Sequence, residues 1–461
     1  MSRRFGLAVI GAGPAGAHAA MAAAEGGVDC IVLDEAEAAG GQVYRAPAAR
    51  PSKPKPEIVE GDRLRAELRG SGARLAFGRR VWLIEPGFVI HTVGDGGPER
   101  IEAEKLILAT GTTERVIPFP GWTTPGVIGL AAATILLKSQ ATLPGRRTLV
   151  AGRGPLLAAV AAGILDLGGE VVAVLDRSPR SRWLRALPRL ASRPDLLGRG
   201  IGWWAKLVRA RVPVLHNSDI GEVTAVDDGL VVKTKEGEPF ACDAVAVGHG
   251  LTPSTDITRL LGVGHRFAPE LGGWVPEQDA FGRTNVDGLL VCGDGAGVRG
   301  AAVASLAGEL AGLAAAKDLG HIDRAEFKAR TSTLQAALAK AGRFGGAMAA
   351  MTAPRADDVF GLSPDTIICR CEDVNCGQIE RAIEDGADTI DQLKAWTRAG
   401  MGPCQGRMCG EAVASLLARH VGGREKVGLW TGRSPIRPVP VADLVDDIAY
   451  ENIPIPKAAP L

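Results

Sequence analysis

The sequence predicts an α/β protein with two related strand–helix–strand units and a small helical module near its C-terminal end. Three observations support this prediction. A glycine-rich turn, GAGPAG, follows an apolar run at residues 5–10, and a second glycine turn lies at residues 152–154. Both turns precede alanine-rich stretches, which is the order expected of parallel α/β units. Five of the eight cysteines fall between residues 369 and 409, beyond both units.

The composition limits the classes of protein and partner. The 461 residues are enough for two to four domains at roughly 100–200 residues per domain. Basic and acidic side chains nearly balance, 53 against 52, so the charge does not suggest a nucleic acid as partner. Eight cysteines are too few for a disulfide scaffold in a chain of this length. We therefore expect small molecules and other proteins as partners.

The N-terminus has two interpretations. Arg3 and Arg4 precede an apolar, alanine-rich stretch, as they would in a twin-arginine signal. We favour a buried strand at residues 5–10 instead, because cleavage would remove the first unit of the fold. The longest other apolar stretch, 298–316, is interrupted by charged residues, so we expect no transmembrane segment. The expected location is cytoplasmic, with any membrane association made through partners.

The first unit has the pattern of a dinucleotide-binding βαβ fold. The strand at 5–10 leads into the glycine turn, a helix to about residue 25 and a second strand at 29–33. The glycines allow a tight turn, a close approach of the backbone to a pyrophosphate, and close packing of helix on strand. An acid at the end of the second strand would accept ribose hydroxyls. The residues of this pattern are Gly11, Gly13, Gly16 and Asp34.

Three later segments extend this first site. GGQVYR comes just after the acid, and LILATG reads as a strand that ends at Thr110-Gly111. Another strand ends at Asp294, ahead of an alanine-rich helix. The Asp294 carboxylate can accept hydrogen bonds from sugar-alcohol hydroxyls, and the helix N-terminus can stabilise negative charge on a reduced ring. This arrangement favours a flavin over a nicotinamide as the cofactor. The alternative is that Asp294 only caps the helix that follows it.

The second unit begins near residue 146 with the strand RRTLVA, followed by a glycine turn, a helix to about residue 167 and another strand. Arg153 is placed to meet a phosphate, whereas Leu157 stands where a third glycine would allow close helix packing. Two alternatives stay open: NAD(P) or another adenine nucleotide binds there, or the fold has lost its ligand. The candidate nucleotide-contacting residues are Gly152, Arg153, Gly154 and Asp176.

Several other residues of the first 325 have structural interpretations. A strand at 243–247 closes the second domain, and His249 after it is expected to be structural rather than catalytic. Trp203-Trp204 mark either a subunit contact or aromatic core filling. No paired carboxylates and no Ser/His/Asp arrangement stand out, which suits electron transfer better than acid–base chemistry. Three cysteines in expected strands are interpreted as small core residues: Cys30, Cys242 and Cys292.

The C-terminal cysteines form two short motifs, C-x-C and C-x4-C, separated by 32 residues. Helices capped by Asn375 and Thr389 lie between the motifs, and Cys409 opens a third helix, so the two loops are expected to meet. Cys376 lies in the first turn of a helix and is not expected to be a ligand. The four expected metal ligands are Cys369, Cys371, Cys404 and Cys409.

Four thiolates suit either a 2Fe-2S cluster or tetrahedral zinc. The C-x-C spacing is tighter than that of the usual zinc knuckle, and a flavin in the same chain would give an electron relay a purpose. We therefore favour the cluster, with zinc and unliganded thiols as the alternatives.

In this order, the motifs over about residues 1–325 resemble the family of flavoproteins with two dinucleotide-binding domains. The resemblance implies a first domain that holds FAD and is interrupted by a second, which often holds NAD(P)H. The first 325 residues contain no C-x2-C or C-x4-C pair of the kind found in relatives that reduce disulfides, so dithiol chemistry is not expected. The FAD contacts that the resemblance implies are Gly11, Gly13, Gly16, Asp34, Gly41, Gln42, Thr110, Gly111 and Asp294.

CRCEDV and MGPCQGRMC resemble the bacterioferritin-associated-ferredoxin-like 2Fe-2S domain, over roughly residues 365–420. With GGQVYR and ATGTTERVIPFPGW, nearly the whole chain resembles the alpha subunit of heteromeric dye-linked amino-acid dehydrogenases. These include opine (octopine or nopaline) oxidases, hydroxyproline and proline dehydrogenases, and hydrogen cyanide synthase. The resemblance implies that an FAD-containing beta subunit oxidises the amine, and a small gamma subunit is a further candidate partner. This chain would carry electrons to a quinone or dye acceptor.

The expected architecture is α/β, with two Rossmann-like dinucleotide-binding domains, the second inserted in the first, plus a small helical C-terminal 2Fe-2S domain. Two other functions stay open: a self-contained NAD(P)H-dependent FAD oxidoreductase and a zinc-stabilised interaction subunit. We expect a helix over 326–341 to end before a Gly-Ala-Met stretch. The expected ranges are 1–117 and 245–330 for the FAD domain, 118–244 for the second nucleotide domain, 331–361 for a helical linker, 362–423 for the 2Fe-2S domain and 424–461 for a proline-rich tail.

Overall fold

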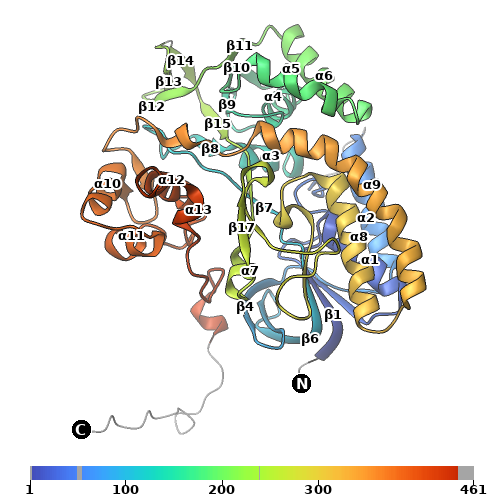
Figure 1. Ribbon diagram of the computed structural model, residues 1–461. Helices are drawn as coiled ribbons and strands as arrows, with labels where there is room; N and C mark the ends of the chain where they lie inside the picture. The colour runs from blue at the N-terminus through green and yellow to red at the C-terminus, as the bar shows by residue number, and fades with distance from the viewer. Residues whose placement is uncertain (1–2, 49–53, 238, 445–461) are drawn as a thin grey trace, which may run out of the picture.

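The computed structural model describes residues 3–48, 54–237 and 239–444, so residues 445–461 of the expected tail lie outside it. Figure 1 shows two α/β domains and a helical C-terminal module, with one long helix leading from the first domain towards the module. Within the described ranges, no helix is both long enough and apolar enough to cross a membrane.

The first domain is built on a seven-stranded sheet in the order β3-β2-β1-β6-β5-β4, with β19 paired to β6. The central strands run parallel, and β4, β5 and β6 form an antiparallel extension. Its elements are β1 (Arg3–Ile10), α1 (Pro14–Glu25), β2 (Cys30–Leu33), α2 (Pro56–Gly70), β3 (Arg74–Ala76), β4 (Arg80–Glu85), β5 (Val89–Val93), β6 (Glu99–Leu108), β7 (Thr112–Glu114), β16 (Leu251–Pro253), α7 (Asp256–Leu260), β17 (His265–Ala268), β18 (Gly273–Pro276), β19 (Leu289–Val291) and α8 (Ala301–Asp318).

Helices α1 and α8 pack against each other at very close range. A Cβ atom at Gly308 would collide with the carbonyl oxygen of Ala15, and one at Gly312 would collide with that of Ala19. The facing residues of α1 are mostly alanines, so both helix surfaces are flat and the backbones approach closely. This contact requires glycine at both positions of α8 and holds both helix N-termini at one edge of the sheet.

The second domain has a five-stranded parallel sheet in the order β11-β10-β9-β15-β8 and a three-stranded antiparallel sheet, β12-β13-β14. Strand β15 pairs with both β9 and β8, so the domain extends to Gly248 and the expected boundary at 244 was four residues short. Its elements are β8 (Val127–Gly129), α3 (Leu130–Ser139), β9 (Arg147–Gly152), α4 (Leu156–Asp166), β10 (Glu170–Asp176), α5 (Arg180–Leu190), α6 (Pro194–Arg209), β11 (Val214–His216), β12 (Ile220–Val226), β13 (Gly229–Thr234), β14 (Pro239–Cys242) and β15 (Ala244–Gly248).

The interpretation of Trp203-Trp204 as core filling is the one that the structure supports. Both side chains are partly buried and pack against the apolar cluster beneath α4 and α6. The Trp204 ring also meets Trp183 of α5 edge-on, with centroids 6.2 Å apart. The tryptophans therefore fasten α6 to α4 and α5.

The long helix α9 (Arg324–Met351) differs from the prediction of a helix ending near residue 341. The Gly-Ala-Met stretch continues the helix because its small residues permit a close contact. A Cβ at Gly345 would collide with the backbone of Arg299, which precedes α8. After α9, a short segment with a 3-10 turn at Ala356–Val359 leads to the C-terminal module.

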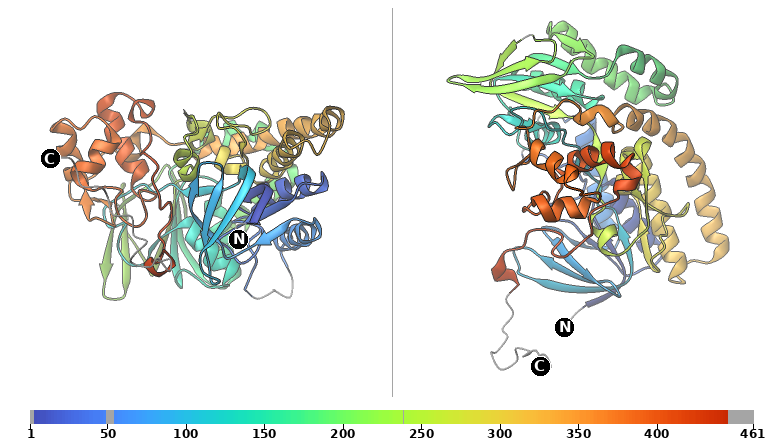
Figure 2. Two further views of the ribbon diagram at one scale, coloured as in Figure 1. Left: turned by 90° about the horizontal axis from the view of Figure 1, so that it is seen from below. Right: turned by 60° about the vertical axis from the view of Figure 1, so that its left-hand side comes forward.

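The C-terminal module is helical, as predicted, and it contacts both α/β domains (Figure 2). The Asn375 and Thr389 side chains cap their helices in capping boxes, each with a glutamine three residues later. Trp122 of the second domain donates from Nε1 to the carbonyl of Ile367, 2.6 Å away. Its elements are β20 (Ile367–Cys369), β21 (Val374–Asn375), α10 (Cys376–Glu384), α11 (Ile390–Thr397), α12 (Gly410–Val421) and α13 (Arg424–Val427).

Candidate functional site

The first glycine turn lies between β1 and α1 and has the geometry that a nucleotide-binding turn requires. Gly11 has a φ of +101°, a conformation that favours glycine, and a Cβ there would collide with the carbonyl of Ala109. A Cβ at Gly16 would collide with the carbonyl of Gly11 itself. Pro14 occupies the first turn of α1, where an N–H group would have no hydrogen-bond partner within the helix, so its absence does not destabilise the helix. The N–H groups of Gly11 and Ala12 are bonded to Leu33 and Asp34, so the N–H groups available to a phosphate are those at the start of α1.

The other predicted contacts of this site lie at the same edge of the sheet. Asp34 follows β2, Thr110 follows β6 and Asp294 follows β19, and these strands are neighbours of β1 or of each other. Because parallel strands end at one edge, the sheet brings these side chains to the glycine turn. Gly41 approaches from the following loop, where a Cβ would lie 3.0 Å from the Cα of Gly13. Thus Asp34, Thr110, Asp294 and Gly41 lie with the glycine turn at one edge of the sheet.

The two carboxylates at this edge of the sheet, Asp34 and Asp294, also hold the backbone around them. Asp34 accepts hydrogen bonds from the N–H groups of Ala12 and Ala36, and Asp294 Oδ1 accepts from Arg299 and Gly300, each at 2.9 Å. Burial raises the pKa of both carboxyls. Asp294 therefore does fix the turn ahead of α8, as the capping alternative proposed, while its Oδ2 accepts no hydrogen bond from the described residues. Gln42 is exposed, where Arg45 Nε donates to its side-chain oxygen at 3.4 Å.

The four predicted cysteine ligands lie in the C-terminal module as two contacting pairs, but among the described residues no three His, Cys, Asp or Glu side chains gather closely enough to hold a metal ion. Cys369 contacts Cys409, and Cys371 contacts Cys404, so the pairs form between the two motifs rather than within them. The first pair is buried and the second is partly exposed. Contact with Cys409, together with backbone N–H groups, lowers the pKa of Cys369 to about 5, so this thiol is ionised at neutral pH. The same contact raises the pKa of Cys409, and burial raises that of Cys371. Together the two pairs supply the four sulfur ligands that a [2Fe-2S] cluster requires.

The loop that carries Cys404 and Cys409 rests on Trp430, a residue that the sequence patterns did not single out. A Cβ at Gly406 would overlap the indole ring, and Gly400 and Gly410 also lie against it. Trp430 is buried, and its Nε1 donates to the carbonyl of Ile390 at 3.0 Å. The three glycines therefore let the loop close on the indole. Cys376 is buried at the start of α10, where burial raises its pKa to about 11, as expected of a bystander.

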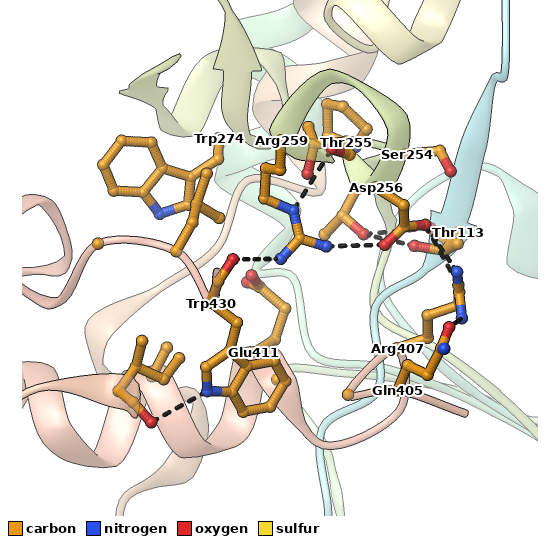
Figure 3. A pocket seen from close by; sticks show the side chains of 18 of the residues that line it. Thr113, Ser254, Thr255, Asp256, Arg259, Trp274, Gln405, Arg407, Glu411 and Trp430 are labelled. Carbon is orange, nitrogen blue, oxygen red and sulfur yellow. Dashed lines mark hydrogen bonds and ion pairs between the residues drawn. The ribbon is translucent and has the colours of Figure 1, made fainter. Parts of the chain in front are cut away.

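The cysteine loop docks directly on the first domain (Figure 3). Arg407 donates from Nη2 to Asp256 Oδ2 at 3.0 Å and from Nη1 to the carbonyl of Cys404 at 3.1 Å. Asp256 opens α7, and Arg259 on the same helix donates to the carbonyl of Trp430. A small cavity of about 100 Å³ lies in this interface, lined on one side by Thr113 and Ser254 and on the other by Gln405, Glu411 and Trp430.

This interface begins next to the predicted flavin contacts. The N–H of Ser254 donates to the carbonyl of Gly111 at 3.0 Å, and the Thr110 hydroxyl donates to the carbonyl of Ser254 at 3.1 Å. Thus Ser254 contacts Thr110 and Gly111 on one side and faces the cysteine loop across the cavity on the other. The two candidate cofactor centres are joined through these residues.

The second glycine turn is bound to another part of the chain. Arg153 is buried, and both of its terminal nitrogens donate to the Asp358 carboxylate, one at 3.1 Å. Arg177 adds a third contact to the same carboxylate, at 3.4 Å. Thr352 lies against Gly154 so closely that a Cβ on the glycine would collide with its methyl group. We call residues 352–359 the strap, because this segment crosses the second turn between α9 and the C-terminal module.

The remaining residues of the second site are likewise held by protein groups. Asp176 is fully buried and accepts from the N–H of Ser178 at 2.8 Å and from Trp183 Nε1 at 3.1 Å. His249 is also buried, and burial among arginines lowers its pKa well below the usual value, which suits the structural role expected of it. Leu157 is buried in the apolar cluster beneath α4, which includes the small residues Ala133 and Ala246. Arg153 is thus engaged by the strap, and Asp176 by Ser178 and Trp183.

Arg115, which sequence reasoning did not single out, ties the three parts of the molecule together. Its guanidinium is buried and donates to the carbonyls of Thr352 at 2.6 Å and Gly272 at 2.7 Å. Its Nε lies 3.6 Å from Glu411 of α12. It stands in the ATGTTERV segment, but nothing in that pattern indicates carbonyl partners 157 and 237 residues away.

The free energy of unfolding is expected to depend on pH through Glu114, the residue before Arg115. Its carboxylate accepts from the N–H of Ala131 at the start of α3, and burial raises its pKa to about 7. The unfolded chain ionises this group near 4.5, so its contribution to stability is full below about pH 4.5 and is lost as the pH rises to about 7. This loss is expected to be about 3 kcal/mol.

The Glu114→Gln variant keeps an oxygen acceptor but has no proton to lose. Its free energy of unfolding is therefore expected to fall less than that of the wild type between about pH 5 and about pH 8. Urea unfolding at a series of pH values measures this difference. Parallel pH profiles for the two proteins would contradict the assignment.

Comparisons with known proteins agree with this geometry. Residues 5–311 match the pyridine nucleotide-disulphide oxidoreductase family, which implies FAD and NAD(P) binding, and residues 367–419 match the BFD-like [2Fe-2S] binding domain. The chain is 33% identical over 460 residues to the opine oxidase A subunit of Rhizobium meliloti (strain 1021), covering 95% of this chain and 98% of the relative. It is also 33% identical to the hydrogen cyanide synthase subunit HcnB of Pseudomonas aeruginosa, covering 96% of this chain and 98% of the relative.

The same fold occurs in a solved structure. The crystal structure of L-proline dehydrogenase from P. horikoshii matches 97% of this chain and 81% of its own, with a TM-score of 0.71 and 20% identity. These matches confirm the predicted α/β fold, the oxidoreductase class and the two kinds of cofactor domain. The chain belongs to the pyridine nucleotide-disulphide oxidoreductase family, in the group of the opine oxidase A subunit and the hydrogen cyanide synthase subunit HcnB, and carries a BFD-like [2Fe-2S] binding domain at its C-terminal side.

Proposed function

We propose that this chain is the electron-transfer subunit of a heteromeric dehydrogenase that acts on a secondary amine or amino acid of the opine, hydroxyproline or proline class. The C–N bond is oxidised on an FAD-containing partner subunit, and electrons leave to a quinone or dye acceptor. The relatives named as subunits of opine oxidase and of hydrogen cyanide synthase match over nearly their whole length, which supports a subunit role.

The observation that carries this proposal is the direct docking of the cysteine loop on the first domain. When bound, FAD exchanges electrons in pairs or singly, whereas a [2Fe-2S] cluster carries one at a time. The residues of this chain hold the two centres in fixed positions: Arg407 locks the loop to Asp256, and Ser254 connects the interface to Gly111. The partly exposed pair, Cys371 and Cys404, offers a route between the cluster and a partner.

The strap argues against the alternative of a self-contained NAD(P)H oxidoreductase. A nicotinamide nucleotide at the second turn would need the guanidinium of Arg153 and the carboxylate of Asp176, and both are engaged by buried protein groups. Displacing Asp358 would leave the buried Arg153 without a carboxylate, which is costly, while Arg177 would keep only Asp219. We infer that the second domain serves mainly to position the strap and the C-terminal module.

The test compares the chain purified alone with the chain purified together with its native partner subunits. We expect dye reduction with octopine, nopaline, hydroxyproline or proline only in the complex, and iron together with flavin absorption in both preparations. Oxidation of the amine at full rate by the lone chain would contradict the subunit role.

Two further results would favour the alternatives. Rapid bleaching of the flavin by NADH or NADPH in the lone chain would favour a self-contained reductase. A colourless preparation that contains zinc and no iron would favour an interaction subunit.

A further inference from the structure

The segment from Arg180 to Arg211, which contains α5 and α6, has an unusual charge. It carries eight arginines and one lysine against a single acid, Asp195, a net charge of +8. The whole chain carries +1, so the remaining residues together carry −7. Positive charge is thus concentrated on two neighbouring helices at the outer end of the second domain, away from the C-terminal module (Figure 1; Figure 2).

Much of this charge is exposed and unpaired. Some of the basic residues are neutralised locally, such as Lys206 by Asp166 and Arg193 by Asp195. Five arginines are exposed, and none of them lies within salt-bridge distance of a carboxylate in the ranges that the structure describes. Their guanidinium groups are free to meet an external anion. They are Arg180, Arg185, Arg189, Arg209 and Arg211.

The same two helices expose large apolar side chains. Leu184 of α5 and Val208 of α6 are 66% and 72% exposed, and Leu187 and Ile201 are also exposed. These residues are not needed to fasten the helices, because other faces do so: Leu190 and Leu207 are buried, and Trp204 meets Trp183. Exposed leucine, isoleucine and valine among unpaired arginines is the pattern of helices that lie in a membrane interface.

We propose that the outward side of α5 and α6, here called the α5–α6 surface, binds a bilayer rich in anionic phospholipid. The arginines meet lipid phosphates, and the apolar side chains enter the boundary between headgroups and acyl chains. A nucleic acid would neutralise the arginines but would leave the leucines, isoleucine and valine exposed to water, so the combination favours lipid. The proposal does not depend on the proposed function.

The experiment is co-sedimentation of the full chain with vesicles of phosphatidylglycerol and phosphatidylcholine in equal parts, or of phosphatidylcholine alone. We expect binding only to the anionic vesicles, weakened by salt at about 0.5 M. The charge-reversal variant R185E/R189E is expected to weaken binding at least about tenfold. The variant L184Q/V208Q is expected to reduce the part of the binding that persists at high salt.

The matched control is R324E/K328E, which changes the net charge equally at the exposed start of α9. It is expected to bind the vesicles like the wild type, and flavin and iron contents show that each variant is folded. Equal loss in R185E/R189E and in the control would overturn the proposal. Binding of duplex DNA but not vesicles, or dissociation of a partner subunit by R185E/R189E on gel filtration, would overturn it as well.

Discussion

The Cys369→Ser chain is expected to purify without its iron and without the visible absorption of the cluster. Cys369 is buried, its pKa is lowered to about 5, and it contacts Cys409, so its thiolate stands ready as a ligand. A serine hydroxyl stays protonated at neutral pH, and its oxygen is a poorer iron ligand than a thiolate sulfur. Iron content is expected to fall from about two atoms per chain to none. Dye reduction by the complex should be lost with it.

The matched control for this variant is Cys376→Ser. Cys376 is also a buried cysteine of the same module, but it does not contact the other four. Its serine variant is expected to keep its iron and the spectrum, with at most a modest loss of stability from burying a hydroxyl. Retention of iron by Cys369→Ser, or equal loss of iron in a folded Cys376→Ser chain, would show that the ligand set is wrong.

The Asp358→Asn variant is expected to unfold with a free energy lower by about 3 to 5 kcal/mol. The substitution removes the negative charge that faces Arg153 and Arg177 and leaves two arginines without their common partner. Because Arg153 is almost fully buried, water cannot replace the lost carboxylate. Urea unfolding of the full chain measures the difference.

The neighbouring Asp357 provides the control. It pairs with Arg355 at 2.6 Å, but both side chains are exposed, so Asp357→Asn is expected to change stability by less than about 1 kcal/mol. The double variant R153M/D358L should recover much of the loss, because it replaces both charged groups by apolar ones of similar size. Equal effects at 357 and 358 would contradict the buried strap contact.

Local sequence patterns were sufficient to predict many of the helices, strands and turns of the first domain. The glycine turn, its helix and the acid after the second strand lie within about 25 residues of one another, and the structure has α1 at Pro14–Glu25 as expected. The caps at Asn375 and Thr389 were also predictable, since a capping box depends on residues three positions apart. Element ends were less predictable. Glycines in α9 suggested an early end, whereas packing of Gly345 on Arg299 extends the helix.

The turns, caps and cysteine motifs could be located from the amino-acid sequence, because each depends on a few neighbouring residues whose backbone preferences act locally. Which of these groups meet depends on the packing of the folded chain. Arg153 lies 205 residues from Asp358, and Trp122 lies 245 residues from Ile367. The cysteines pair across their motifs, not within them. Such contacts depend on how sheets and helices pack in three dimensions, and a local pattern carries no information about a partner so distant along the chain.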